Sequence, residues 1–87
     1  MKEPYSILKY PLSTEKSFKL MESENKLVFI VDRRAKKQEI KDAFEKLFKA
    51  KVLNINTLID SDGKKKAFIK ISNETPAIDI ATQLGMM

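Results

Sequence analysis

The strongest constraint on the fold is a pair of strand-like segments joined by a short turn. Val52 to Ile59 and Lys65 to Ile71 are rich in β-branched residues, and an Asp62–Gly63 pair lies between them. Aspartate followed by glycine supplies the residue that tolerates positive φ in a tight hairpin loop. The two segments are therefore predicted to pair as antiparallel strands.

The two faces of this hairpin are predicted to differ, because successive residues of a strand point to opposite sides. One face is apolar and is expected to carry Leu53, Ile55, Thr57 and Ile59 with Ala67, Ile69 and Ile71. The other is expected to carry Asn54, Asn56 and Leu58 with Lys66, Phe68 and Lys70. The first face suits a hydrophobic core, and the second combines amides, lysines and an aromatic ring.

Three helices are predicted from apolar spacing and capping residues. From Lys36 to Ala50 the apolar side chains form one stripe, made of Ile40, Ala43, Phe44, Leu47 and Phe48. A shorter helix is expected from a Ser13 or Thr14 cap to about Glu22, with Phe18 and Met21 inward. A terminal helix is expected to begin with Thr75 as its cap and Pro76 as its first residue, and to stop at Gly85 after Ile78, Ala81 and Leu84.

Two further strands complete the predicted order. Tyr5 to Leu8 is expected to be a short opening strand that ends before Pro11 and is followed by a turn. Lys26 to Asp32 is almost continuously apolar, which is typical of a central strand covered on both faces. The resulting order is β-α-β-α-β-β-α, an α+β fold with a mainly antiparallel four-stranded sheet layered with helices. We expect a single domain over residues 1–87.

The positive charge of the chain is concentrated in one stretch. Residues 33–51 contain eight basic and three acidic residues, which accounts for the whole net charge of +5. Such a block attracts phosphates, because each neutralised phosphate releases condensed counterions. Arg33, Arg34, Lys36 and Lys37 lie where a strand is expected to lead into a helix, and a helix N-terminus also favours anions. Phosphate binding is favoured there over a merely solvated turn.

The polar sheet face and the turn lysines are weaker signals. Asn54, Asn56 and Phe68 suit unpaired RNA, since amides hydrogen-bond to bases and a ring stacks on them. An ordinary solvated sheet face explains the same alternation more simply. Lys64, Lys65 and Lys66 also have a simple alternative role, because lysines at sheet edges prevent aggregation.

Several functional classes are excluded. The chain has neither cysteine nor histidine, so it lacks thiolate metal ligands and the usual general base, and no metal or other cofactor is expected. Asp60 and Asp62 read as turn formers, since catalytic carboxylates need burial or close pairing. The longest apolar run, Leu27 to Val31, is far below the ~20 residues that span a bilayer. We therefore expect a cytoplasmic protein without membrane insertion or enzymatic activity.

Five segments carry a family resemblance: ILKYPLSTEKS (Ile7 to Ser17), NKLVFIVDRRAKKQEIKDAFEKLF (Asn25 to Phe48), KVLNINTLI (Lys51 to Ile59), KKAFIKI (Lys65 to Ile71) and AIDIATQLG (Ala77 to Gly85). Together they resemble the universal large-subunit ribosomal protein family number twenty-three, in its short archaeal-like form. Each is modest alone, and their order and spacing are specific. The long hairpin extension of bacterial-type members is absent, since Asp60 to Lys64 is a tight turn. Lys36 also stands where a Ser or Thr helix cap is expected.

The resemblance implies a structural, RNA-binding protein of the large ribosomal subunit beside the exit of the nascent-peptide tunnel. Its implied partners are ribosomal RNA, a neighbouring small helical ribosomal protein and nascent-chain factors such as the signal recognition particle. Glu15 resembles the acidic residue of the factor-docking surface. The implied RNA contacts are Lys9, Lys16, Arg33, Arg34, Lys36, Asn54, Asn56, Thr57, Lys65, Lys66 and Lys70.

Two other classes of function remain as alternatives. A free-standing protein-interaction module would use an exposed sheet edge or helix face, with the charge serving only solubility. Binding to a protein partner that is insensitive to salt, without RNA affinity, would favour this class. An enzyme would require a buried carboxylate or lysine with a shifted pKa, which the sequence does not indicate.

Overall fold

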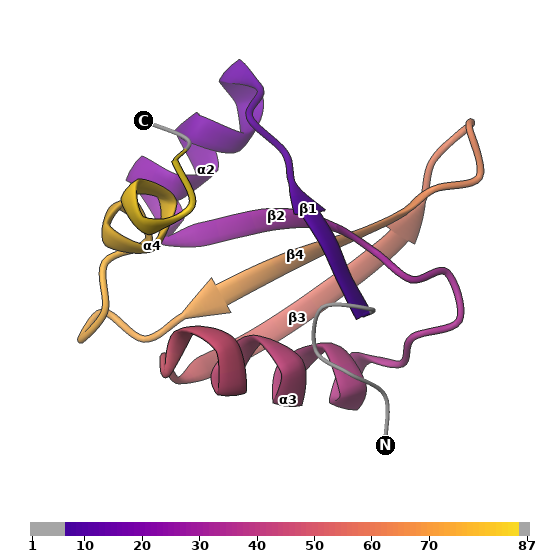
Figure 1. The fold of residues 1–87 in the computed structure, drawn as a ribbon. Helices are drawn as coiled ribbons and strands as arrows, with labels where there is room; N and C mark the ends of the chain where they lie inside the picture. The colour runs from indigo at the N-terminus through magenta and orange to yellow at the C-terminus, as the bar shows by residue number, and fades with distance from the viewer. Residues whose placement is uncertain (1–6, 86–87) are drawn as a thin grey trace.

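The fold is a four-stranded antiparallel sheet covered by helices (Figure 1). The computed structural model describes residues 7–85. Their elements are β1 (Leu8–Pro11), α2 (Glu15–Glu24), β2 (Lys26–Val31), α3 (Lys37–Phe48), β3 (Val52–Ile59), β4 (Lys65–Ile71) and α4 (Ala77–Gln83). The strand order across the sheet is β1-β2-β4-β3. The predicted α+β class and the predicted order of elements are both confirmed.

The strand register fixes which side chains share a face. Ile69 of β4 lies between Leu27 of β2 and Ile55 of β3, and all three side chains are buried. The next residue of β4, Phe68, lies between Val28 and Asn56 and points to the other side. The predicted hairpin is confirmed, with a turn in which Gly63 has a φ of 81°.

The hydrophobic core fills the space between one face of the sheet and the helices. Phe29 of β2 meets Phe44 of α3 edge to face, with ring centroids 5.8 Å apart, and Phe48 lies against both rings. Met21 of α2 and Ile80 of α4 are buried in the same cluster. Figure 1 shows α3 running below the strands and α2 and α4 grouped at the left end. The predicted apolar stripe of α3 therefore packs on the sheet.

The first strand differs from the prediction. Tyr5 and Ser6 lie outside the described residues, and β1 begins at Leu8 and includes Pro11. The opening strand was expected to end before Pro11, and this was wrong, because β1 includes Pro11. Proline is compatible with β1 because β1 is an edge strand, so the ladder does not need every N–H group. The chain stays paired one residue further, where the Leu12 N–H donates to the Val28 carbonyl (2.9 Å).

A β-bulge changes the predicted face of Leu53. The register of β3 against β4 shifts between Val52 and Asn54, so that Val52 takes the core position and is buried. Leu53 was expected in the apolar face and is instead 55% exposed. Strict alternation could not predict this, because one extra residue in a strand moves the side chains that precede it to the opposite face of the sheet.

The ends of α2 and α3 differ from the predicted ends by one or two residues. α2 begins after Thr14, whose hydroxyl accepts from the Ser17 N–H (3.2 Å), and it ends two residues later than expected. α3 is shorter than predicted at both ends, since Lys36 is its N-cap and Lys49 turns left-handed with a φ of 53°. In α4 the buried side chains include Ile80 and Ala81, whereas Ile78 is 40% exposed.

Thr75 was predicted to be the N-cap of α4, and this was wrong. Thr75 lies in the preceding turn, and the N-cap position belongs to Pro76, which offers no side-chain hydrogen bond. The hydrogen bond that caps α4 comes instead from Asn25, which lies between α2 and β2. The Asn25 Oδ1 accepts from the Ala77 N–H (2.6 Å). A residue 52 positions away thus satisfies one of the orphan amides of the helix.

Candidate nucleic-acid interface

The sheet face opposite the core carries four of the polar side chains singled out from the sequence, together with Phe68. Asn54 and Asn56 of β3 and Lys70 of β4 are exposed there, and Phe68 and Lys66 are half-buried beside them. Asn54 pairs with Lys70 and Asn56 with Phe68 across the hairpin. The register therefore places amide, ammonium and ring side by side. This arrangement matches the prediction for these five residues.

The N-terminal part of α2 adds a wall to this face. A groove of about 150 Å³ is lined by Lys16 and Leu20 from α2 and by Lys66, Phe68 and Leu58 from the hairpin, among other residues. Two predicted contacts, Lys16 and Lys66, thus border one concave surface although they lie 50 residues apart in the sequence. A phenyl ring between two cations suits a nucleotide, whose base stacks and whose phosphate pairs with ammonium.

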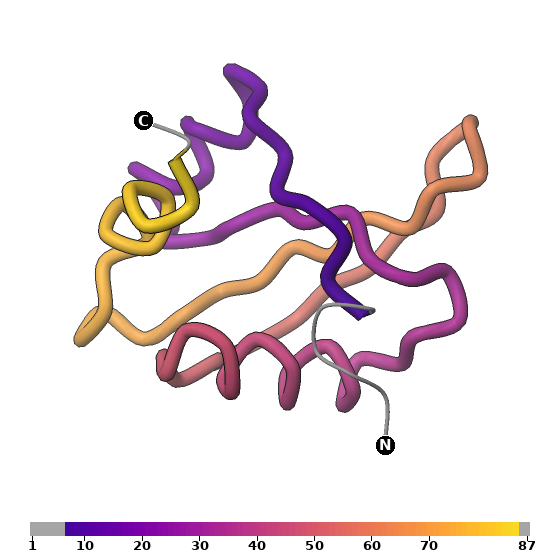
Figure 2. Tube along the Cα trace, viewed as in Figure 1, coloured from indigo at the N-terminus to yellow at the C-terminus, as the bar shows by residue number. Residues whose placement is uncertain are grey.

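A second basic surface forms at the end of the sheet where β3 turns into β4, and it shares Lys66 with the groove. The β2–α3 loop and the β3–β4 turn lie at the same end, as the chain trace shows (Figure 2). A Cβ placed at Gly63 would lie 3.8 Å from Nη1 of Arg33, so the loop arginine reaches the turn. We call the cations gathered here the junction–turn cluster: Arg33, Arg34, Lys36, Lys64 and Lys66.

The turn itself is held by Asp60. Its Oδ1 accepts from the N–H groups of Asp62 (2.9 Å) and Lys64 (3.0 Å), and its Oδ2 lies 4.0 Å from Nζ of Lys66. These contacts are those of a carboxylate that forms a turn. Asp60 therefore offsets part of the charge of Lys66 and fixes the conformation that presents Lys64.

Lys64 remains fully charged at neutral pH. Its Nζ donates a hydrogen bond to the Tyr10 hydroxyl (3.4 Å), which is the main reason that its pKa is raised. Electrostatic interactions with Tyr10, Asp62 and Asp60 raise this pKa further, and desolvation opposes them. Tyr10 was not singled out from the sequence. The sequence showed only an aromatic residue next to Lys9. It could not show that Tyr10 is exposed or that its hydroxyl contacts a lysine 54 positions away.

Lys36 caps α3 without help from its own side chain, which has no acceptor. The Lys36 N–H donates to Oε1 of Glu39 (3.0 Å), so the carboxylate of the first turn supplies half of a capping box. The Arg34 N–H likewise donates to Oδ1 of Asp32 (2.9 Å). The loop is thereby ordered by backbone bonds, and the side chains of Arg33, Arg34 and Lys36 are exposed.

Two predicted contacts lie on the core side of the hairpin, opposite its polar face. Thr57 pairs with Ala67 on the core side of the hairpin and is half-buried. Lys65 is also on that side, and its Nζ donates to the Ala35 carbonyl (2.6 Å), which ties β4 to the β2–α3 loop. Thr57 and Lys65 are therefore not brought together with Asn54, Asn56 and Lys70.

The remaining predicted residues are exposed. Lys9 lies on β1, next to Tyr10 and far along the chain from the hairpin. Glu15 is in the first turn of α2, where a carboxylate stabilises the helix dipole, and it directly precedes Lys16. The start of α2 therefore carries the candidate factor contact Glu15 directly beside the candidate RNA contact Lys16.

Neither a metal cluster nor a membrane helix is found in residues 7–85. No group of three or more acidic residues lies close enough there to hold a metal ion. Within the same range, every helix is too short and too polar to cross a bilayer.

Comparison with known proteins gives a consistent result. The family model described as "Ribosomal protein L23" matches residues 6–82. A protein of Trypanosoma brucei brucei named "Large ribosomal subunit protein uL23" is 46% identical over 85 residues. The aligned region is 98% of this chain and 52% of the trypanosome protein, so the chain spans about half the length of that relative.

Proposed function

This chain belongs to the ribosomal protein L23 family, and we propose that it is a structural constituent of the large ribosomal subunit that binds ribosomal RNA near the tunnel exit. The family consists of ribosomal proteins without enzymatic activity. We place the protein in cytoplasmic ribosomes, with a small helical ribosomal protein as its neighbour.

The main support for RNA binding is the convergence of cations from separate segments. The junction–turn cluster combines residues 33–36 with residues 64–66, and most of its charges have no acidic partner within 4 Å in the described part of the chain. Unpaired cations gathered on one end of a rigid sheet suit a phosphate backbone, because they need little reorganisation to bind it. The groove with Lys16, Lys66 and Phe68 supports contact with unpaired bases nearby.

The protein is expected to co-sediment with large subunits and, when isolated, to bind large-subunit RNA in a salt-sensitive way. About five phosphate contacts would lower the affinity roughly 100-fold between about 50 and 200 mM salt. Filter binding across a salt series checks this. A salt-insensitive affinity for protein, combined with absence from ribosomal fractions, would favour the protein-interaction module instead.

We also propose that Glu15 belongs to a docking surface for nascent-chain factors such as the signal recognition particle. The carboxylate is exposed on the first turn of α2 and lies outside the core. Replacing it should therefore leave folding almost unchanged, apart from the loss of a favourable helix-dipole interaction of about 0.5 kcal/mol.

Glu15→Lys is expected to weaken factor binding to isolated ribosomes about tenfold or more, since a buried contact would change from attraction to repulsion. Subunit incorporation should be unchanged. The matched control is Glu22→Lys, which makes the same charge change on the same helix. Equal factor affinities for wild type and Glu15→Lys ribosomes, measured by pelleting, would argue against this role.

A further inference from the structure

The outer edge of β3 is the longer of the two free edges of the sheet. β3 ends the strand order and has eight residues, whereas β1 at the opposite edge has four. An unpaired edge presents backbone N–H and C=O groups at strand spacing, and it can pair with an extended segment of another chain. Proteins usually protect such an edge.

The first half of this edge is protected from within the chain. The Val52 N–H donates to Oε2 of Glu45 (3.0 Å), and the Ile55 N–H donates to Oδ1 of its neighbour Asn54 (2.9 Å). The Ile55 N–H therefore points outward, and alternation turns the N–H groups of Thr57 and Ile59 the same way. The second half, Thr57 to Ile59, is the part left open for pairing.

Apolar side chains are exposed along the same strand. The described residues include five large exposed hydrophobics, and three of them are Leu53 (55%), Leu58 (45%) and Ile59 (53%) on β3. Leu58 and Ile59 lie on opposite faces of the strand beside its open half. Exposed apolar residues gathered on an edge strand indicate a contact surface.

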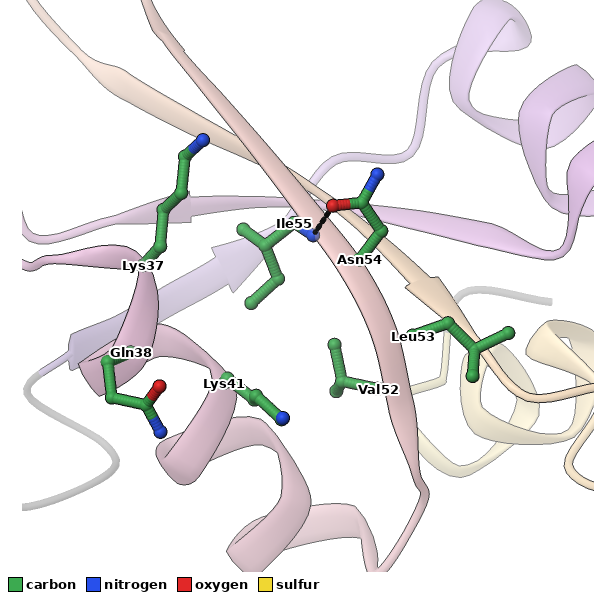
Figure 3. A pocket seen from close by; sticks show the side chains of 7 residues that line it. All are labelled: Lys37, Gln38, Lys41, Val52, Leu53, Asn54 and Ile55. Carbon is green, nitrogen blue, oxygen red and sulfur yellow. Dashed lines mark hydrogen bonds between the residues drawn. The ribbon is translucent and has the colours of Figure 1, made fainter.

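The groove beside the protected half is basic. Its volume is about 250 Å³, and Lys37, Gln38 and Lys41 of α3 face Val52 to Ile55 of β3 across it (Figure 3). None of the seven lining residues is acidic. Lys37 and Lys41 are one helical turn apart on α3, and both lysines border the groove.

We propose that this edge receives an extended segment of a neighbouring protein, which pairs with Thr57 to Ile59 and continues into the groove. Its apolar side chains would contact Ile59, and its acidic side chains would face Lys37 and Lys41. RNA fits less well, because it offers no backbone groups at strand spacing and does not bury aliphatic side chains. The proposal rests on the proposed function only in that the large subunit supplies the neighbour.

Photo-crosslinking in assembled large subunits tests this occupant. With Ile59→benzoylphenylalanine in the full-length chain, irradiation is expected to join position 59 to a protein segment that alternates apolar and acidic residues. The control is Ile78→benzoylphenylalanine on α4, another exposed apolar site that should not yield this segment. A crosslink from position 59 to RNA alone, or to no macromolecule, would overturn the proposal.

Thr57→Pro tests the pairing itself in the same crosslinking background. It removes an outward N–H and leaves the β3–β4 ladder intact, so the protein should still enter subunits while the protein crosslink falls at least tenfold. Unchanged crosslinking would overturn strand pairing. If Thr57→Pro does not fold, a double variant of the groove lysines, Lys37→Glu/Lys41→Glu, tests the proposal instead. Its crosslink yield is compared with that of the control double variant Lys46→Glu/Lys51→Glu.

The expected result for the lysine pair is at least a fivefold loss of the protein crosslink, with no loss for the control pair. Equal yields from the two pairs would overturn the proposal. Sedimentation distinguishes failure of this proposal from failure of the proposed function. A chain that never enters large subunits contradicts the proposed function. A chain that enters large subunits but forms no protein crosslink at β3 contradicts only the edge-pairing proposal.

Discussion

Replacing Asn25 with alanine is expected to lower the free energy of unfolding by about 3–5 kcal/mol, measured by urea denaturation. The Asn25 Nδ2 donates to the carbonyls of Ile71 (3.1 Å), Ser72 (3.2 Å) and Thr75 (3.3 Å), and its Oδ1 caps α4 through Ala77. Because Nδ2 has only two hydrogens, its three bonds share two N–H groups, and the four bonds together contribute about 3 kcal/mol. Asn25 also adopts a φ of 54°, which costs alanine roughly 1–2 kcal/mol.

Two further substitutions at Asn25 separate these contributions. Asn25→Gly removes the four side-chain hydrogen bonds but tolerates positive φ, so it should be about 1 kcal/mol more stable than Asn25→Ala. The matched control is Asn73→Ala, an exposed asparagine in the β4–α4 loop, for which a change below about 0.5 kcal/mol is expected. An Asn25→Ala protein as stable as this control would show that Asn25 does not hold α4.

Reversing two charges of the junction–turn cluster is expected to have the largest effect on RNA binding. Arg33→Glu/Arg34→Glu should lower the affinity for large-subunit RNA about 100-fold at about 50 mM salt, and should reduce the slope of log affinity against log salt by about 2. Both side chains are exposed, so the fold should persist. Filter binding over a salt series measures both quantities.

The control for this reversal is Lys46→Glu/Lys51→Glu, which changes the net charge equally within the same basic stretch. Lys46 lies near the end of α3 and Lys51 in the loop after it, both exposed and far along the chain from the β2–α3 loop. A charge effect that is merely long-range would weaken RNA binding similarly in both variants. Similar losses would therefore refute a specific role for the junction–turn cluster.

Secondary structure was largely predictable because its signals are local. The bounds of β3 and β4 match the predicted ranges, since β-branched composition and the Asp62–Gly63 turn specify the hairpin within twenty residues. The stripe from Ile40 to Phe48 specified both the presence and the buried face of α3. The family resemblance was confirmed by the match over residues 6–82.

The errors arose where a distant segment overrides a local preference. Thr75 is a good cap by local rules, but Asn25 supplies the hydrogen bond to α4 across the fold. Leu53 continues the alternation of its strand, but a bulge gives its core position to Val52. Lys65 resembles its neighbours in sequence, but its ammonium group is bound to the Ala35 carbonyl.

The candidate sites show the same division between local and long-range effects. The sequence by itself determined which residue types are present, the density of charge from Arg33 to Lys51, and the order of strands and helices, because these depend on composition and short-range periodicity. Only the tertiary structure decided that Arg33 meets the turn at Gly63, that Lys16 shares a groove with Lys66, and that half of the β3 edge stays open. These proximities depend on strand register and helix packing, which arise from contacts between segments far apart in the chain.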